Sequence, residues 1–395
     1  MTAREARGRT LSVGAAALIL AAACSPSTSA GPTATGGPTA IADVTVAPAA
    51  SPKPTRPAAT SIDLHLLDAR YVPGDAPVSA DGQVLWTAGE RTLSEVWRFV
   101  PGTNQPEQIY TSPRRKANIS SIVASSAGYA FVEESEPAYG EGGWRVWFLS
   151  APGAEPVELA RGVAKLAGVS PFLAMAEDRV VWASFDEPAT GFVTRVQMAV
   201  ASDVAHVTTL VERPVNESLI WYPTLHRDEL WFSTIHPNSD PTAEGPEYNL
   251  EMLDLGDTAA RPVPFEGTAH DFNPAVNDDY LVWKANRRGD SALNWGTLKV
   301  LDRHSWKIWT IPGGDANRPT IGDRFVAFDE MSPSSMPIYD PMTRTLLDLA
   351  SAPAFGQEAR LAFGGESLSG RLLAFSYGPA DASAPPRIGW AMLPE

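Results

Sequence analysis

The chain has 395 residues, with 46 Asp and Glu against 31 Lys and Arg, and its formal net charge is −15. Nucleic-acid binding, and adhesion to an anionic membrane by charge, require clustered Lys and Arg, so this balance argues against both. Cys24 is the only cysteine, which excludes an internal disulfide and a thiolate metal site.

The N-terminal segment has the order of a secretory signal. Three arginines precede an apolar stretch over residues 11–23, which is too short to span a bilayer as a stable helix. The stretch leads into LAAAC (residues 20–24), which resembles the lipobox of bacterial lipoproteins. The resemblance implies cleavage before Cys24 and acylation of its sulfur, for instance with palmitate. The alternative is an ordinary signal peptide cut nearby, with Cys24 an unused thiol.

The next segment is almost entirely Ser, Pro, Thr, Ala and Gly. Such a composition cannot bury enough apolar surface to offset the entropy of ordering, so it predicts a disordered tether with a span of about 30 Å. We therefore divide the chain into a lipoprotein signal peptide (1–23), a lipid-anchored linker (24–60) and a folded domain (61–395). This organisation predicts a domain anchored on the extracytoplasmic side of a membrane, at the cell surface or in the periplasm.

The folded domain repeats a short unit. Its clearest copy is NPAVNDDYLVW (273–283), with a proline, a strand, a turn and a second strand that ends on an aromatic residue. The proline is replaced by Ile122 in the second copy and by Glu366 in the seventh. Successive terminal aromatics are separated by 45, 51, 50, 51, 45 and 47 residues, and they are Trp86, Phe131, Trp182, Phe232, Trp283, Phe328 and Phe375.

This period predicts an all-β fold, a β-propeller, because each four-stranded blade has an apolar face that only the next blade can cover. We predict seven blades, with six or eight as alternatives. The last copy ends after its third strand, so residues 61–69 are expected to supply the fourth strand and close the ring. Most of the 12 tryptophans should fill space between blades, with Trp295 in a polar loop as the expected exception.

The repeat resembles the TolB-like and WD40-like repeats of bacterial envelope proteins. That resemblance implies the propeller architecture without choosing a function, because propellers serve binding, scaffolding and catalysis alike.

The loops that join second to third strands, and one blade to the next, share one face of a propeller and are long in this chain. Loops longer than turn geometry requires are where binding usually resides. Their candidate ligand-binding residues are Glu133, Glu134, Asp186, Glu187, His236, His270, Asp271, Arg287, Arg288, Asp329 and Glu330. Carboxylates around a channel mouth can hold a hard cation such as calcium or attract a cationic ligand. The alternative is that these acids are simply solvated.

His236, His270 and Asp271 are the candidate metal ligands, because two histidines and a carboxylate from neighbouring loops can reach one divalent cation. Some TolB-like propellers act as uronate lyases with a histidine-bound metal, so the resemblance implies uronate lyase activity as an alternative function. Histidines that only brace loops are the alternative. The sequence has no HExxH motif, phosphate-binding glycine loop or nucleophile elbow, and we assign no catalytic residue and no cofactor.

The sequence therefore favours a non-catalytic lipoprotein that binds a protein, a peptide or a glycan through the loop-rich face of a propeller. A metal-assisted polysaccharide lyase or hydrolase at the same face is the first alternative. A domain that only scaffolds an envelope assembly is the second.

Overall fold

A computed structural model describes residues 62–395, with gaps. The gaps are 90–91, 104, 115, 136–142, 164–169, 187–190, 237–246, 258, 264–269, 287–295, 314, 331–334, 350–360 and 380–382, and the side chains of 163 and 361–364 are also left out. The signal, the linker, Cys24, Glu187, Arg287, Arg288 and Trp295 lie outside the described residues. In the part of the chain that is described, no helix is long and apolar enough to cross a membrane.

The described residues form 28 strands in five four-stranded antiparallel sheets and one eight-stranded sheet. The eight-stranded sheet consists of two antiparallel four-stranded units joined by one parallel pairing of Tyr248 with His270, so the strands group into seven units. Unit 1 consists of β2 (Val78–Ala80), β3 (Gln83–Ala88), β4 (Glu95–Phe99) and β5 (Glu107–Thr111). Unit 2 consists of β6 (Asn118–Ser125), β7 (Gly128–Glu134), β8 (Gly143–Leu149) and β9 (Val157–Val163). Unit 3 consists of β10 (Phe172–Ala176), β11 (Arg179–Asp186), β12 (Val193–Val200) and β13 (Asp203–Pro214).

Unit 4 consists of β14 (Leu219–His226), β15 (Glu229–His236), β16 (Glu247–Asp254) and β17 (Arg261–Pro262). Unit 5 consists of β18 (His270–Val276), β19 (Tyr280–Asn286), β20 (Thr297–Asp302) and β21 (Ile308–Thr310). Unit 6 consists of β22 (Ala316–Ile321), β23 (Val326–Glu330), β24 (Pro337–Asp340) and β25 (Thr345–Asp348). Unit 7 consists of β26 (Leu361–Ser369), β27 (Leu372–Pro379), β28 (Arg387–Met392) and β1 (Leu64–Leu66).

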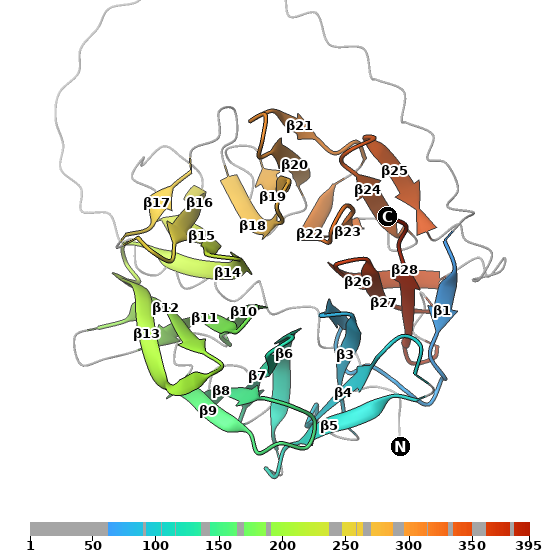
Figure 1. Cartoon of the computed structure of the whole chain (residues 1–395), viewed down its shortest axis with the longest axis horizontal. Helices are drawn as coiled ribbons and strands as arrows, with labels where there is room; N and C mark the ends of the chain where they lie inside the picture. Colours follow the sequence, from blue (N-terminus) through green and yellow to red (C-terminus); the bar gives the residue numbers. More distant parts are fainter. Residues whose placement is uncertain are drawn as a thin grey trace, which may run out of the picture.

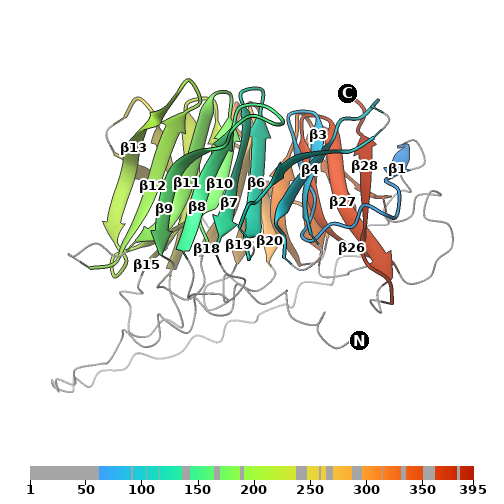
Figure 2. The same cartoon turned by 90° about the horizontal axis from the view of Figure 1, so that it is seen from below.

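The units stand around a central axis, with the first strand of each unit innermost (Figure 1). Seen from the side, the strands run between two faces of the ring (Figure 2). The loop-rich face carries the connections from second to third strands and from unit to unit, and the tight-turn face carries the remaining turns. The propeller fold is thus confirmed. The strand grouping supports seven blades, and the count for the whole chain stays a prediction.

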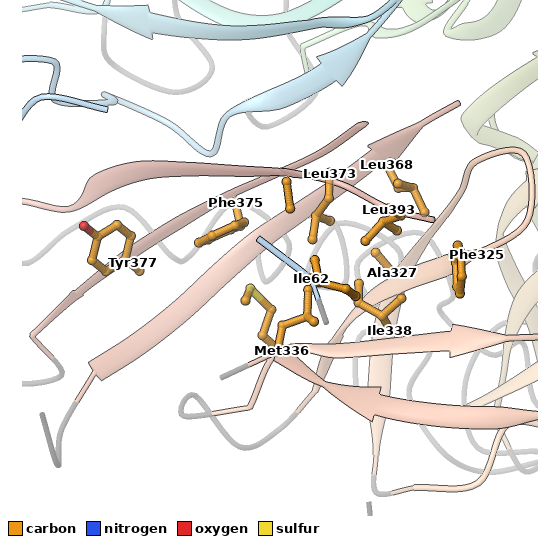
Figure 3. Packing of buried hydrophobic residues seen from close by; sticks show 12 residues of the cluster. Ile62, Phe325, Ala327, Met336, Ile338, Leu368, Leu373, Phe375, Tyr377 and Leu393 are labelled. Atoms are coloured by element: carbon orange, nitrogen blue, oxygen red, sulfur yellow. The ribbon is translucent and has the colours of Figure 1, made fainter. Parts of the chain in front are cut away.

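The repeated aromatic of each unit packs against the preceding unit, as the repeat predicts. Phe131 joins Leu85 and Val96 of unit 1 in one buried cluster, and Trp182 joins Phe148 of unit 2 in the next. Figure 3 shows the buried cluster that Phe375 shares with Ala327, Met336 and Ile338 of unit 6. All seven aromatics are at most 1% exposed. The inter-unit core therefore depends on one large ring per repeat.

The N-terminal strand closes the ring, which confirms the predicted pairing of the two chain ends. In the antiparallel register of β1 with β28, Leu64 faces Ala391 and Leu66 faces Gly389. The Leu67 N–H donates to the carbonyl of Ile388 at 3.0 Å. Strand β28 runs toward the tight-turn face, so the antiparallel β1 begins at that face.

Gly389 provides a test of this closure, because a Cβ at its position would lie 2.2 Å from the ring of Phe375. That ring is fully buried and cannot swing away. We expect Gly389→Ala to lower the free energy of unfolding by about 1–3 kcal/mol in urea titrations. At Gly256 a Cβ would meet only Asp254 Oδ1, at 3.4 Å, so Gly256→Ala should change stability much less. Equal effects of the two substitutions would contradict the packing.

Candidate functional site

The innermost strands of units 4 to 7 share a β-bulge toward the loop-rich face. Pairing slips within β14, β18, β22 and β26, and at each slip one residue adopts a left-handed backbone. These residues have φ values of 49°, 53°, 46° and 64°, and they are Tyr222, Asn273, Arg318 and Gly365. Non-glycine residues adopt this conformation at a cost, and bulges re-aim side chains next to functional sites. The four bulges thus change the direction of side chains on the innermost strands. We call the surface that the innermost strands form around the central axis the inner wall.

The repeated proline follows directly after the left-handed residue in units 4, 5 and 6. Pro223, Pro274 and Pro319 stand there, and Glu366 takes the same place in unit 7. Proline suits an inner strand because that strand is the edge of its sheet, where a ladder N–H is dispensable. Replacing it with Glu366 puts a carboxyl group into a position that is otherwise apolar.

Glu366 forms a carboxyl pair with Asp329 of unit 6. Glu366 is only 5% exposed. Burial raises the pKa of Glu366 well above its ordinary value, and the hydrogen bond and charge of Asp329 raise it further. The Gly365 N–H donates to Asp329 Oδ1 at 3.3 Å, which fixes the second carboxylate. Burial and the neighbouring carboxylate therefore both favour the protonated form of Glu366, because two carboxyls in contact cannot both ionise cheaply.

Arg318 lies beside this pair, and Lys284 lies near Arg318. The side chain of Arg318 is 61% exposed, and its Nη1 lies 3.8 Å from Asp329 Oδ2. Lys284 is 1% exposed, with Nζ 5.2 Å from the centre of the Phe272 ring. Burial, followed by the charge of Arg318, lowers the pKa of Lys284 to about 8. Opposite charges are thus concentrated in the inner wall of units 5 to 7, with Arg318 the group most open to solvent.

Asparagines and a tyrosine extend the cluster into units 4 and 5. Asn273 Nδ2 donates to Asn317 Oδ1 at 3.3 Å, and the Asn273 N–H donates to Ser233 Oγ at 3.0 Å. Asn273 Oδ1 is buried and accepts no hydrogen bond from the described residues. The Tyr222 ring packs 5.2 Å from that of Phe272. Arg318, two amides and a carboxyl pair together can bind a polar ligand through directed hydrogen bonds.

Among the predicted rim acids, Asp329 belongs to this cluster, whereas Glu133 and Glu134 brace neighbouring units. Tyr110 Oη donates to Glu133 Oε2 at 3.0 Å, and Arg114 Nη1 lies 3.3 Å from Glu133 Oε1. Burial raises the pKa of Tyr110, and the charge of Glu133 raises it further. Glu134 contacts the hydroxyl of Ser170, just before unit 3. These acids hold units together within the described part of the ring.

Asp186 and Glu330 do not join the carboxyl pair in any described contact. Asp186 pairs with Arg195 on the adjacent strand, and Arg195 Nε also lies 2.6 Å from Glu212 Oε2. Glu330 ends β23 opposite Ala316. Asp186, Arg195 and Glu212 thus form a row of alternating charges across three neighbouring strands of unit 3.

The predicted metal ligands have separate partners. His236 Nε2 lies 2.9 Å from Thr234 Oγ1 and 3.7 Å from Glu251 Oε1. The His270 ring packs edge-on against Tyr248 at 5.4 Å, and Asp271 accepts a 2.6 Å hydrogen bond from Trp283 Nε1. Among the described residues, no group of three His, Cys, Asp or Glu is placed to hold a metal ion. The structure therefore does not bring His236, His270 and Asp271 together.

Glu251, a neighbour of His236, forms an ion pair between two units. Both guanidinium nitrogens of Arg213 in unit 3 donate to its carboxylate at 2.6 Å. Burial alone would raise the pKa of Glu251, but the hydrogen bonds from Arg213 and His236 lower it to about 2. The Arg213–Glu251 pair thus joins units 3 and 4 beside a predicted site residue.

Sequence reasoning missed Glu366, Arg318, Asn273 and Lys284 as site residues. One signal was visible: Glu366 interrupts the proline repeat. Arg318 and Asn273 directly precede repeat prolines, but nothing in the sequence shows that this position is left-handed and faces the ring interior.

Comparisons with known proteins establish the fold alone. No family model matches the chain, and no curated protein matches its sequence. The β-propeller domain of the Trilobed protease from Pyrococcus furiosus aligns over 82% of this chain and 96% of its own, with a TM-score of 0.59 and 12% identity. An oligogalacturonate lyase from Vibrio parahaemolyticus aligns over 85% and 97%, with a TM-score of 0.53 and 10% identity. A putative TolB from Agrobacterium tumefaciens aligns over 59% and 78%, with a TM-score of 0.40 and 10% identity.

The carboxyl pair predicts a specific pH dependence of stability. Because the folded-state pKa of Glu366 is raised above its ordinary value of 4.5, the stability it contributes is full below that pH and is lost as pH rises toward the folded pKa. Glu366→Gln stays neutral, so it should gain stability relative to the wild type as the pH rises above about 4.5 in urea titrations. Glu155→Gln, at an exposed position, is the control. Parallel curves for Glu366→Gln and the wild type would show that the acid is not held neutral.

Proposed function

We propose that this protein is a lipid-anchored, extracytoplasmic propeller that binds a protein, peptide or glycan without transforming it. The ligand is held at the inner wall of units 4 to 7, toward the loop-rich face. One observation carries the proposal: an exposed arginine, Arg318, stands over the buried Asp329–Glu366 pair at a left-handed backbone position.

The charge pattern indicates what the ligand presents. Arg318 offers several N–H donors in one plane, which suits a carboxylate or an amide oxygen of the ligand. The raised pKa of Glu366 favours its neutral form, and the exposed Arg318 lies beside the pair with the buried Lys284 near Arg318. Arg318 thus exposes a positive charge at this site in a chain with a net charge of −15, and this contrast favours an anionic or strongly polar group of the ligand.

Binding accounts for these contacts better than the metal-assisted lyase alternative. His236 and Asp271, which were to share one ion, each contact a different neighbouring side chain. The likeness to an oligogalacturonate lyase from Vibrio parahaemolyticus, at 10% identity, is one of fold. We therefore put forward no catalytic step.

The anchor is tested at Cys24, which the lipobox-like motif places at the start of the mature chain. Cys24→Ser removes the sulfur that would be acylated, so the domain should move from the membrane fraction to the soluble fraction. Fractionation followed by immunoblotting measures the shift, and mass spectrometry of the wild-type N-terminus shows the acyl groups. Retention of the variant on membranes would contradict lipid anchoring.

The ligand site is tested with Arg318→Asn, because Asn273 already occupies the equivalent left-handed position. Removing a charge-assisted hydrogen-bond donor should weaken ligand capture about tenfold or more. Purified variants are compared on a glycan array and in pull-downs from detergent-solubilised envelope.

The matched control is Arg227→Asn. Arg227 is also an exposed, left-handed arginine, with φ 52°, but it lies on the tight-turn face. Loss of capture with Arg227→Asn and not with Arg318→Asn would place the ligand elsewhere.

A further inference from the structure

Two neighbouring turns on the tight-turn face have an unusual backbone. In unit 5, Trp306 lies between β20 and β21 with φ 58° and is 72% exposed. In unit 6, Arg344 lies in the turn between β24 and β25 with φ 56°. A bulky residue in this conformation is an outlier, since glycine adopts it without strain. Trp306 thus has a strained backbone and a large apolar ring in contact with water. Burial of the ring does not offset the cost of the strain, because the ring is exposed.

The two turns are built alike and lie side by side. Asp302 Oδ1 accepts the backbone N–H of the second and third residues after it, and Asp340 Oδ1 does the same in unit 6. The Arg344 guanidinium lies 4.5 Å from the centre of the Trp309 ring, and Trp309 Nε1 donates to Tyr339 Oη at 2.8 Å. These contacts hold the outer edges of units 5 and 6 together.

Apolar and basic side chains of these turns, and of the strand after Trp306, are exposed to solvent. Met342 is 69% exposed and Ile308 is 42% exposed, and Lys307 and Arg344 are exposed cations. We call Trp306, Lys307, Ile308, Met342 and Arg344 the Trp306 patch. Two further basic residues of the unit 5 turn are engaged elsewhere, Arg303 with Glu229 and His304 with Asp279. Trp and Met beside cations are typical of a surface that enters a lipid headgroup region.

The path of the chain places a membrane near this face. Leu64 at the start of β1 pairs with Ala391 near the end of β28, so the chain enters the ring at the tight-turn face. The Trp306 patch belongs to the same face, because it lies in turns between third and fourth strands. An anchor at Cys24 would therefore be connected to the domain at this face and not at the loop-rich face.

We propose that the Trp306 patch rests on the headgroups of the anionic membrane that holds the anchor. The proposal depends on the lipid anchor of the proposed function. Lys307 and Arg344 meet anionic headgroups while Trp306, Ile308 and Met342 enter the interface. The net charge of −15 repels the rest of the domain from such a surface, so the contact is confined to the patch and orients the ring. The candidate site then faces away from the membrane and stays open to its ligand.

The test uses the full lipidated chain in vesicles. With Cys24 acylated, Met342→Cys supplies the one free thiol for a fluorophore, and nitroxide lipids quench the label near headgroups. In phosphatidylcholine vesicles with about 30% phosphatidylglycerol, quenching should be roughly threefold stronger at position 342 than for Phe192→Cys. Phe192, 38% exposed, precedes β12 on the loop-rich face. Adding Trp306→Gly and Lys307→Ser, which suit the turn, should abolish the difference.

Equal quenching at the two positions, or quenching that survives Trp306→Gly with Lys307→Ser, would overturn the proposal. Failure of the anchor is recognised separately by mass spectrometry of the N-terminus. In that case the Cys24→Ser chain is sedimented with the same vesicles at low salt. Salt-dependent binding that the double substitution removes supports the patch, and no binding overturns it.

Discussion

The antiparallel pairing of β1 with β28 is the constraint on which the rest of the structure depends. Unit 7 takes only three strands from the C-terminal end of the chain, and β1 supplies its fourth. Once the ring is closed, Trp86 of unit 1 packs with Leu372 and Ala374 of unit 7, as the other repeated aromatics pack with their preceding units. Without closure, units 1 and 7 would expose the faces that the rest of the ring buries. The same pairing determines on which face the N-terminal segment joins the domain.

Packing between consecutive units brings charged side chains together in units 5 to 7. Asp329 and Glu366 belong to different units, and they meet because β23 of unit 6 packs against β26 of unit 7. Burying two carboxyls and Lys284 costs stability, since each group loses hydration. The Gly365 N–H and the nearby Arg318 offset part of that cost. Buried groups with shifted pKa values, such as Glu366 and Lys284, are common at functional sites.

The fold could be predicted because its determinants are local and repeated. The spacing of aromatics such as Trp182 and Phe232 reports one buried ring per unit, and the truncated last unit shows that a strand must come from the other end. The site could be predicted only in part. A strand-ending acid such as Glu133 can point to the rim or to the neighbouring unit, and the sequence does not say which. Its partners, Tyr110 and Arg114, belong to another repeat. Left-handed positions such as Arg318 and Trp306 carry no sequence signal, because the residues there are not glycine.

Hydrogen exchange of the amides in β1 tests the closure most directly. The Leu67 N–H donates to Ile388, and β1 forms the outer strand of unit 7. Closure predicts that the amides bonded to β28 exchange only when the domain unfolds as a whole, as those of β27 do. Rapid exchange throughout residues 62–67, while β27 and β28 stay protected, would show that β1 is not part of the sheet. The ring would then not be closed by its two ends.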